Sequence, residues 1–284
     1  MLNKIKVLSA ALALTLGSQL TLANQAVNSL EAKSTAESIQ KGMDISLKTK
    51  TVDQGWQDFT ADMLMVLRNS QGQESVREVK MKSLEQLDDG DKSLTVFNKP
   101  RDVKGTAFLS YSHAVGADDQ WLYLPSLKRV KRIASNNKSG PFMGSEFSFE
   151  DLSSFEIKKY SYNYLGEEKL SDKFLTGAQI ELDTYKVEQV PTDKSSGYSK
   201  RIVWIDKDEY RIVKVEFYDR KKSLLKTLSY QNFKLYLGKY WRANTSKMVN
   251  HQSGKETELQ WNNYNFQTGL AESDFSKTAL KRGR

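Results

Sequence analysis

Few side chains in this 284-residue sequence have the types and spacing that chemistry requires. The two histidines, His113 and His251, lie far apart, and neither has a second ligand at metal-binding spacing. We expect both to be structural. The acidic runs at residues 88–91 (Asp-Asp-Gly-Asp) and 206–209 (Asp-Lys-Asp-Glu) lack the spacing of a calcium loop, and they are typical of solvated turns.

Whole classes of chemistry are missing from the sequence. It has no cysteine, which excludes disulfides, zinc–thiolate sites, cysteine nucleophiles and the lipid-modified cysteine of a bacterial lipoprotein. Nucleophile-elbow, phosphate-loop, zinc-protease and dinucleotide-binding patterns are absent as well. We therefore predict a protein that is not an enzyme and needs no cofactor or metal. A secreted lipid hydrolase is the weakest alternative.

The first 23 residues are typical of a secretory signal peptide. Lys4 and Lys6 give a positive start, residues 7–16 an apolar core, and residues 21–23 (Thr-Leu-Ala) a cleavage site. The alternative is a retained membrane anchor, although the apolar run is short for a spanning helix. We expect a periplasmic protein whose mature part, residues 24–284, forms a single domain.

The basic charge of the chain favours anionic surfaces as partners. The formal net charge is +8, and it becomes +6 once Lys4 and Lys6 are removed. In an exported protein, lipid head groups are better candidates than nucleic acid, so we expect transient contact with a membrane surface. Arg129 and Arg132, in the basic run of residues 128–133, are predicted to form a rim that meets phosphate or an acidic partner. The same run is also compatible with the polar edge of an ordinary strand.

Strands are the elements that must position these residues. Residues 56–133 and 178–266 consist of short alternating runs separated by turns, as in an antiparallel meander. About ten or eleven strands without a partner sheet are expected to curl. The predicted fold class is α+β, mainly β: a strongly curved antiparallel sheet, or incomplete β-barrel, covered by a few helices.

Two helices are predicted near the ends of the mature chain. Residues 24–50 are rich in helix formers, and Ile39, Met43 and Leu47 form a narrow apolar stripe that must pack on something. Residues 271–282 are typical of a short helix or a frayed tail.

The stretch from residue 119 to residue 155 has the most unusual apolar content. A strand signal ends at Pro125, a basic run and a turn-rich segment follow, and residues 148–151 (Ser-Phe-Glu-Asp) match a helix capping box. So much aromatic surface beside a loop indicates that something packs on it. The segment is either a moving lid or a fixed plug. The predicted ligand-binding residues of the cavity and lid are Trp121, Tyr123, Phe142, Met143, Phe147, Phe149, Leu152, Phe155 and Trp204.

The same stretch resembles a known family. Residues 121–133 (WLYLPSLKRVKRI) and 140–152 (GPFMGSEFSFEDL) are similar to the signature of LolA-like outer-membrane lipoprotein-sorting proteins, in a branch associated with RND-type exporters. Residues 204–207 (WIDK) match a second family motif, while Glu146 and Phe149 replace the family's Asp and Tyr. The resemblance implies an incomplete barrel around a hydrophobic lipid cavity, a fold shared with the lipid carrier LppX and the stress regulator RseB.

The function that the resemblance implies is transport. We expect a periplasmic carrier that binds lipid or lipoprotein acyl chains and ferries them between the inner and outer membranes. Its partners would be the lipid or lipidated protein cargo and an inner-membrane RND-type exporter or Lol-type complex. The alternative is an RseB-like regulatory or sensor protein that binds lipid or lipoprotein and signals to an inner-membrane partner.

Overall fold

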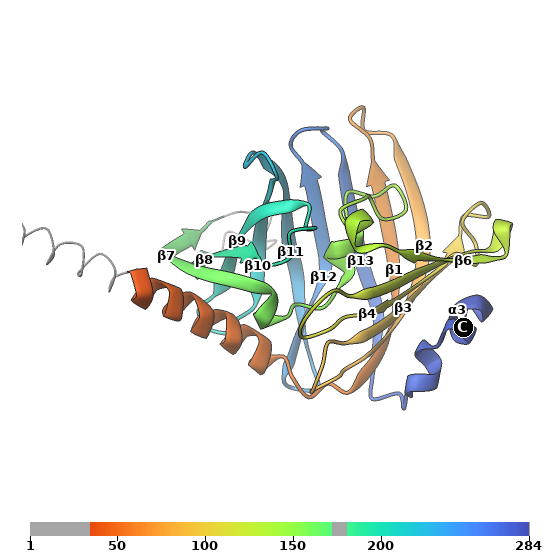
Figure 1. The fold of residues 1–284 in the computed structure, drawn as a ribbon, viewed down its shortest axis with the longest axis horizontal. Coiled ribbons are helices and arrows are strands. Elements are labelled where there is room, and N and C mark those ends of the chain that lie inside the picture. The colour runs from red at the N-terminus through yellow and green to blue at the C-terminus, as the bar shows by residue number, and fades with distance from the viewer. Residues whose placement is uncertain (1–34, 172–180, 284) are drawn as a thin grey trace, which may run out of the picture.

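A single antiparallel sheet dominates the computed structural model, which describes residues 35–171 and 181–283 (Figure 1). The predicted signal peptide lies outside the described residues. The strands are β1 (Asp58–Arg68), β2 (Glu74–Leu84), β3 (Lys92–Lys99), β4 (Ala107–Tyr111), β5 (Asp119–Leu124), β6 (Arg129–Ile133), β7 (Tyr160–Leu170), β8 (Leu182–Pro191), β9 (Tyr198–Asp206), β10 (Ile212–Asp219), β11 (Leu224–Tyr236), β12 (Tyr240–Asn250) and β13 (Glu256–Phe266).

The sheet is long and does not close. Its strand order is β6-β5-β4-β3-β2-β1-β13-β12-β11-β10-β9-β8-β7, so β6 and β7 are the two edges. This arrangement confirms the predicted fold class. The described residues form 13 strands rather than ten or eleven, because β7 was not recognised in the sequence and the basic run that forms β6 was not counted as a strand. The Tyr160-Ser-Tyr162-Asn-Tyr164 start of β7 has the alternation of a strand.

Alternation along the strands separates two faces. The main core lies on the concave face and includes Met65 of β1, Phe97 of β3, Phe108 of β4, Val203 of β9 and Met248 of β12, all almost completely buried. A smaller core lies on the outer face of β3, β4 and β5, under η5 (Glu272–Phe275) and α3 (Lys277–Arg282). The predicted C-terminal helix is therefore present, and it covers the outside of the sheet (Figure 1).

Residues 35–52 form the helix that covers the β7–β8 end of the concave face. Two residues of the predicted apolar stripe do not make this contact, since Ile39 and Leu47 are 47% and 49% exposed, whereas Met43 packs against the main core. Ile45 is buried in that core, and a Cβ placed on Gly42 would lie 3.0 Å from the backbone nitrogen of Tyr164. The stripe prediction was therefore wrong for Ile39 and Leu47, because the close approach of Gly42 to β7 rotates the helix so that these two side chains face outward.

The two edges of the sheet are joined across its concave face. Residues 134–159, which we call the crossing segment, run from the end of β6 to the start of β7 and contain η2 (Ser135–Asn137), η3 (Phe149–Leu152) and η4 (Ile157–Lys159). In Figure 1 the green helical turn of this segment lies against the sheet. A single chain segment thus takes the place that a second sheet would take in a sandwich.

Within residues 35–171 and 181–283, no helix is long and apolar enough to cross a bilayer. The same residues contain no cluster of three or more histidine or acidic side chains suited to a metal ion.

Candidate functional site

A tight turn in the crossing segment inserts aromatic side chains into the concave core. Met143 and Gly144 both have positive φ, a conformation that favours glycine at the second position. The backbone N–H of Phe142 donates to the carbonyl oxygen of Phe147 at 2.7 Å, which closes the turn. Phe142 then lies among aromatic rings of the sheet, with its ring centroid 5.1 Å from that of Phe108.

Most of the predicted ligand-binding residues gather at this point. Six of them lie in the main core or pack against it, on the concave side of the sheet. They are Phe142, Met143, Phe147, Phe149, Leu152 and Phe155. These side chains of the crossing segment occupy the concave face in this structure, where the sequence predicted a cavity.

Three predicted residues belong to the other face. Trp121 and Tyr123 of β5 point outward into the core under α3, and Trp204 of β9 belongs to a third outward-facing cluster. The structure separates them from Phe142 because successive side chains of a strand alternate between faces. On β5 the inward residues are Leu122 and Leu124. Trp121, Tyr123 and Trp204 were predicted to line the cavity because they are large and aromatic, but their odd or even position along the strand decides which face of the sheet they occupy.

A buried ion pair fastens the crossing segment to the sheet. The Asp151 carboxylate accepts from Lys226 Nζ of β11 at 2.7 Å, and the two side chains are only 5% and 4% exposed. Lys226 Nζ also donates to the carbonyl oxygen of Glu146 at 2.8 Å. The Tyr198 hydroxyl donates to Asp151 at 2.8 Å, and its burial raises the pKa of Tyr198 well above its usual value. We call Asp151, Lys226 and Tyr198 the anchor.

Further hydrogen bonds hold the segment on both sides of the anchor. Gln120 of β5 donates from Nε2 to the carbonyl oxygen of Phe149 at 2.9 Å. The Glu150 carboxylate accepts from the Ser196 hydroxyl and the Gly197 backbone N–H, each at 2.8 Å. Burial raises the pKa of Glu150. The segment is therefore attached to both halves of the sheet through polar groups, while its apolar side chains point inward.

The ionised form of one carboxyl group, that of Asp91 beneath the end of the crossing segment, is electrostatically unfavourable. Asp91 accepts from the backbone N–H of Gln86 at 3.1 Å, and its own backbone N–H donates to the Ser154 hydroxyl at 3.2 Å. Burial is the main cause that raises the pKa of Asp91 to about 7, and the nearby negative charge of Glu156 raises it further. Glu156 itself pairs with Lys50 of the helix over residues 35–52.

This raised pKa predicts a dependence of stability on pH. Between pH 4 and pH 7 the folded state holds a proton on Asp91 that the unfolded chain has released, so stability falls as pH rises through that window. Asp91→Asn is expected to remove this fall and to be more stable than wild type at pH 8 by up to about 4 kcal/mol. Urea denaturation of both proteins at pH 5 and pH 8 measures this difference in the free energy of unfolding. An unchanged pH slope in the variant would contradict the assignment.

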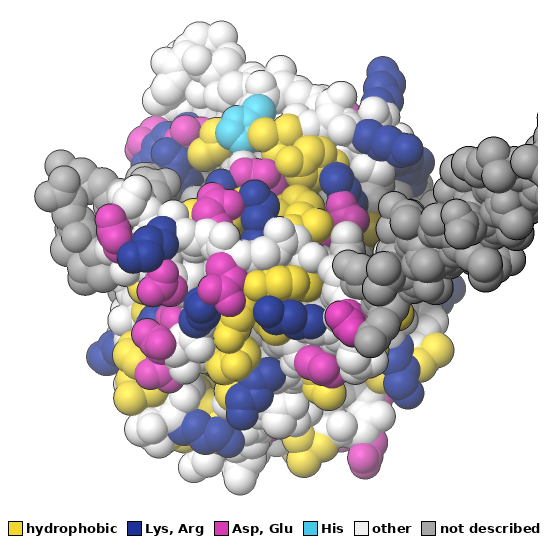
Figure 2. All heavy atoms as spheres, turned by 90° about the vertical axis from the view of Figure 1, so that its left-hand side faces the viewer, with side chains coloured by type: hydrophobic (Ala, Val, Ile, Leu, Met, Phe, Trp, Pro, Cys, Tyr) yellow, Lys and Arg dark blue, Asp and Glu magenta, His cyan; other side chains and the backbone are white. Residues whose placement is uncertain are grey.

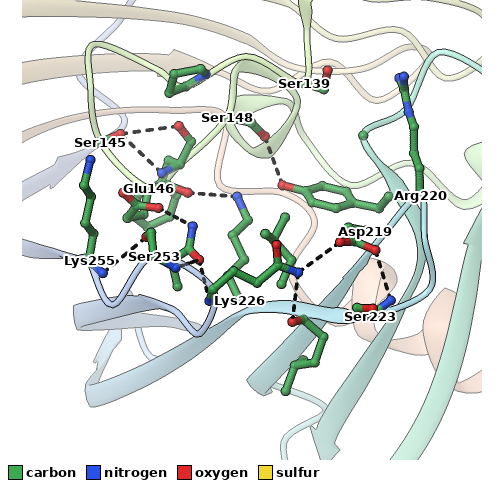
Figure 3. Close-up of a pocket in the computed structure, with 18 of the residues that line it drawn as sticks. Ser139, Ser145, Glu146, Ser148, Asp219, Arg220, Ser223, Lys226, Ser253 and Lys255 are labelled. Atoms are coloured by element: carbon green, nitrogen blue, oxygen red, sulfur yellow. Dashed lines mark hydrogen bonds between the residues drawn. The ribbon is translucent and has the colours of Figure 1, made fainter. Parts of the chain in front are cut away.

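An open pocket of about 1040 Å³ lies beside the anchor (Figure 3). Its walls are the turn of the crossing segment, the start of β9, and the hairpin ends that join β10 to β11 and β12 to β13. The lining combines apolar surface, including Phe147 and Leu224, with polar side chains: Asn250 Nδ2 donates to Glu146 at 2.6 Å, and Gln252 Nε2 donates to Asp219 at 2.9 Å. Phe147 lines the pocket and also belongs to the main core, so the pocket and the concave interior meet at that ring.

The predicted basic rim is an exposed edge strand. Arg129 and Arg132 both lie on β6, and Arg132 pairs with Asp119 of β5. Charged side chains on an edge strand discourage pairing with other chains. Figure 2 shows the opposite end of the molecule, on the β7 side, where Lys and Arg are mixed with Asp and Glu and form no continuous basic patch.

The histidines and acidic turns make local contacts. His113 lies between Asp89, at 2.8 Å, and Asp119, at 3.4 Å, and its bond to Asp89 is the main cause that raises the pKa of His113. His251 contacts the Thr227 hydroxyl at 2.8 Å. Residues 88–91 and 207–209 lie in the connections between strands, where the sequence predicted turns. Asp206 is instead the last residue of β9, and its buried carboxylate accepts from Arg211 Nε at 2.8 Å.

Sequence reasoning missed the residues of the sheet that hold the segment. Lys226 and Tyr198 stand in strands where alternation predicts an inward position, but a lysine in such a position is normally interpreted as a surface residue. The available signal was parity: Lys226 is two residues from the buried Leu228.

The open, strongly curved antiparallel sheet is similar in fold to a LolA superfamily protein from Nitrosomonas europaea, with a TM-score of 0.65 at 21% identity over 84% of this chain and 98% of that one. A family model described only as an uncharacterized protein matches residues 89–282. No curated protein matches the chain.

Two structures are more similar still. An outer membrane lipoprotein-sorting protein domain from Vibrio parahaemolyticus is 58% identical, with a TM-score of 0.81 over 86% of this chain and 100% of that one. A DUF1329 family protein from Desulfovibrio piger is 28% identical, with a TM-score of 0.78 over 86% of this chain and 99% of that one. The chain belongs to the LolA-like family of outer-membrane lipoprotein-sorting proteins. Its assignment to the branch associated with RND-type exporters stays a prediction.

Proposed function

We propose that this protein is a periplasmic carrier that binds the acyl chains of a lipid or lipidated protein on its concave face and performs no chemistry on them. The observation that carries the proposal is that the crossing segment supplies part of the concave core. The outer half of that core is made of Phe142, Phe147, Phe149 and Leu152, which belong to one segment attached at its two ends, and not to a second sheet. Such a segment can move off the concave face, and the acyl chains of a ligand can take the place of its apolar side chains.

Replacing the crossing segment by acyl chains keeps the energetic cost of moving the segment low. Burying an acyl chain of about 14 methylenes contributes on the order of 10 kcal/mol, at ~0.8 kcal/mol for each methylene. The acyl chains would cover the same apolar side chains of the sheet that the crossing segment covers now. What opening must break is therefore chiefly the polar attachment, which is the anchor and the hydrogen bonds of Gln120 and Glu150.

The pocket beside the anchor is the proposed entrance. Phe147 separates it from the concave core, so displacing the turn that carries Phe147 would join the two spaces. The pocket's polar side chains suit the head group of a lipid or the polypeptide part of a lipidated protein, while the acyl chains pass inward. Delivery between the two membranes, with an RND-type exporter or Lol-type complex as inner-membrane partner, is the remaining part of the proposal.

The first test is the ligand itself. The full chain, purified from the periplasm and extracted with organic solvent, is expected to yield an acyl lipid or lipopeptide by mass spectrometry. It should also speed the transfer of a fluorescent phospholipid between vesicles. A wild-type protein that yields no acyl ligand and transfers no lipid would rule out the carrier function.

Leu152→Asp is expected to lower ligand recovery at least several-fold, because it places a charge on the apolar side of η3. Leu127→Asp is the matched control: Leu127 is 65% exposed in η1 (Pro125–Leu127), so recovery should equal that of wild type. Circular dichroism checks that both variants keep the sheet. Equal recovery from the two variants would exclude the crossing segment from ligand binding.

A further inference from the structure

One arginine points into the apolar interior of the sheet. Arg201 lies on β9 at the same parity as Val203 and Ile205, whose side chains are completely buried in the concave core. Alternation therefore directs the guanidinium of Arg201 to the concave side. In an ordinary core, a residue at this position would be apolar.

The contacts of Arg201 orient its guanidinium without neutralising it. Its Nε donates to Gln189 Oε1 of β8 at 2.6 Å. The guanidinium carbon lies 4.1 Å from the ring centroid of Tyr160 and 5.2 Å from that of Phe155. Within residues 35–171 and 181–283, Arg201 has no carboxylate partner, and its two terminal nitrogens have no hydrogen bond. The planar group is held in place with its terminal N–H groups unused.

Tyr230 of β11 supplies a second unused group. Its side chain is only half-buried and packs against the concave core, and in the described part of the chain its hydroxyl has no hydrogen-bond partner. Burial raises the pKa of Tyr230 to about 12, while the charge of Arg201 acts in the opposite direction. Burial likewise raises the pKa of Tyr162, and the positive charge of Arg201 opposes this rise.

Arg201 is half-buried, and a partly desolvated cation without a counter-charge is stabilised by an anion that pairs with it. The guanidinium fork matches a carboxylate or a phosphate in geometry, and stacking on two rings fixes its plane beforehand. The Tyr230 hydroxyl, on the same concave face two strands away, can donate to the anionic group of a ligand that spans the two. A ligand whose acyl chains lie along the concave face would bring its own anionic group to these donors.

We propose that Arg201 and Tyr230 form an internal subsite for the anionic group, carboxylate or phosphate, of an acyl-chain ligand. This inference rests on the proposed function, and it adds a charge preference that apolar burial alone does not supply. The protein would distinguish acidic lipids from neutral lipids of equal chain length, with Arg201 as the main determinant and Tyr230 as the secondary one.

The test measures the affinity of the full mature chain for three probes: palmitate, a dipalmitoyl phosphatidic acid and methyl palmitate. Wild type is expected to bind the two anionic probes more tightly than the ester. Arg201→Gln should weaken the anionic probes about tenfold or more and change methyl palmitate less than about twofold. Tyr230→Phe, which removes only the hydroxyl, should weaken the anionic probes by a smaller factor.

The comparison between the palmitate and phosphatidic acid arms identifies the preferred anion. Arg132→Gln on the outer edge strand is the control, and it should bind all three probes as wild type does. Equal weakening of all three probes by Arg201→Gln would assign Arg201 a purely structural role. A wild-type protein that binds acyl probes but does not distinguish the ester from palmitate would overturn the subsite and leave the carrier function intact. If wild type binds none of the probes, the carrier function fails as well.

Discussion

Lys226→Met is expected to lower the free energy of unfolding by about 3–5 kcal/mol, the cost of leaving one partner of a buried ion pair without its counter-charge. The variant leaves the Asp151 carboxylate almost completely buried, with the Tyr198 hydroxyl and the backbone N–H of Ser148 as its remaining donors. It also removes a hydrogen bond to the carbonyl oxygen of Glu146. Urea denaturation followed by tryptophan fluorescence measures the loss.

A surface pair gives the matched control for this variant. Lys200 and Glu188 are joined at 2.7 Å on neighbouring strands, but both side chains reach solvent. Lys200→Met should therefore change stability by less than about 1 kcal/mol. The double variant Lys226→Met/Asp151→Leu should recover part of the lost stability, because it removes the isolated charge. If Lys226→Met costs no more than Lys200→Met, the pair is not an anchor.

The second large effect is expected from fastening the crossing segment with a disulfide. A Cβ placed on Gly197 would lie 2.6 Å from the Cβ of Ser139. A disulfide needs about 3.5–4.5 Å between these atoms, so the double variant Ser139→Cys/Gly197→Cys requires a shift of only about 1 Å. Because the chain has no cysteine of its own, the new pair would form the only disulfide.

The oxidised variant is expected to lose acyl-probe uptake by at least about tenfold, because the segment can no longer leave the concave face. A reductant should restore uptake to the level of wild type. The single variant Ser139→Cys, treated in the same way, controls for effects of the oxidant. Full uptake by the oxidised double variant would show that the segment is a fixed plug and that a ligand binds elsewhere.

Local patterns in the sequence were sufficient for much of the fold. Alternating runs and Gly- or Asp-rich turns predicted most strands, the single curved sheet and the turns at residues 88–91 and 207–209. The capping box at residues 148–151 was also recognised, and the structure shows Ser148 N donating to Asp151 at 2.7 Å. These features depend on neighbours in the chain, so sequence reasoning reaches them.

The errors share a different physical origin. Trp121 and Trp204 are large and aromatic, yet they point away from the concave face, because the parity of each strand relative to that face is set by its pairing with other strands. Ile39 and Leu47 form a regular helical stripe with Met43, yet the close approach of Gly42 to Tyr164 leaves these two side chains exposed, while Ile45 packs in the core. Neither outcome is encoded in the local spacing of residues.

The sequence by itself determined an antiparallel sheet without a partner sheet and an aromatic segment that had to cover it, while the secretory leader stays a prediction. Only the tertiary structure decided which side chains meet beneath that segment. Lys226, Tyr198 and Arg201 come from strands far from residues 134–159 in the chain, and each looks like a surface residue when considered alone. Their inward positions follow from strand pairing and sheet curvature, which are long-range properties of the folded chain.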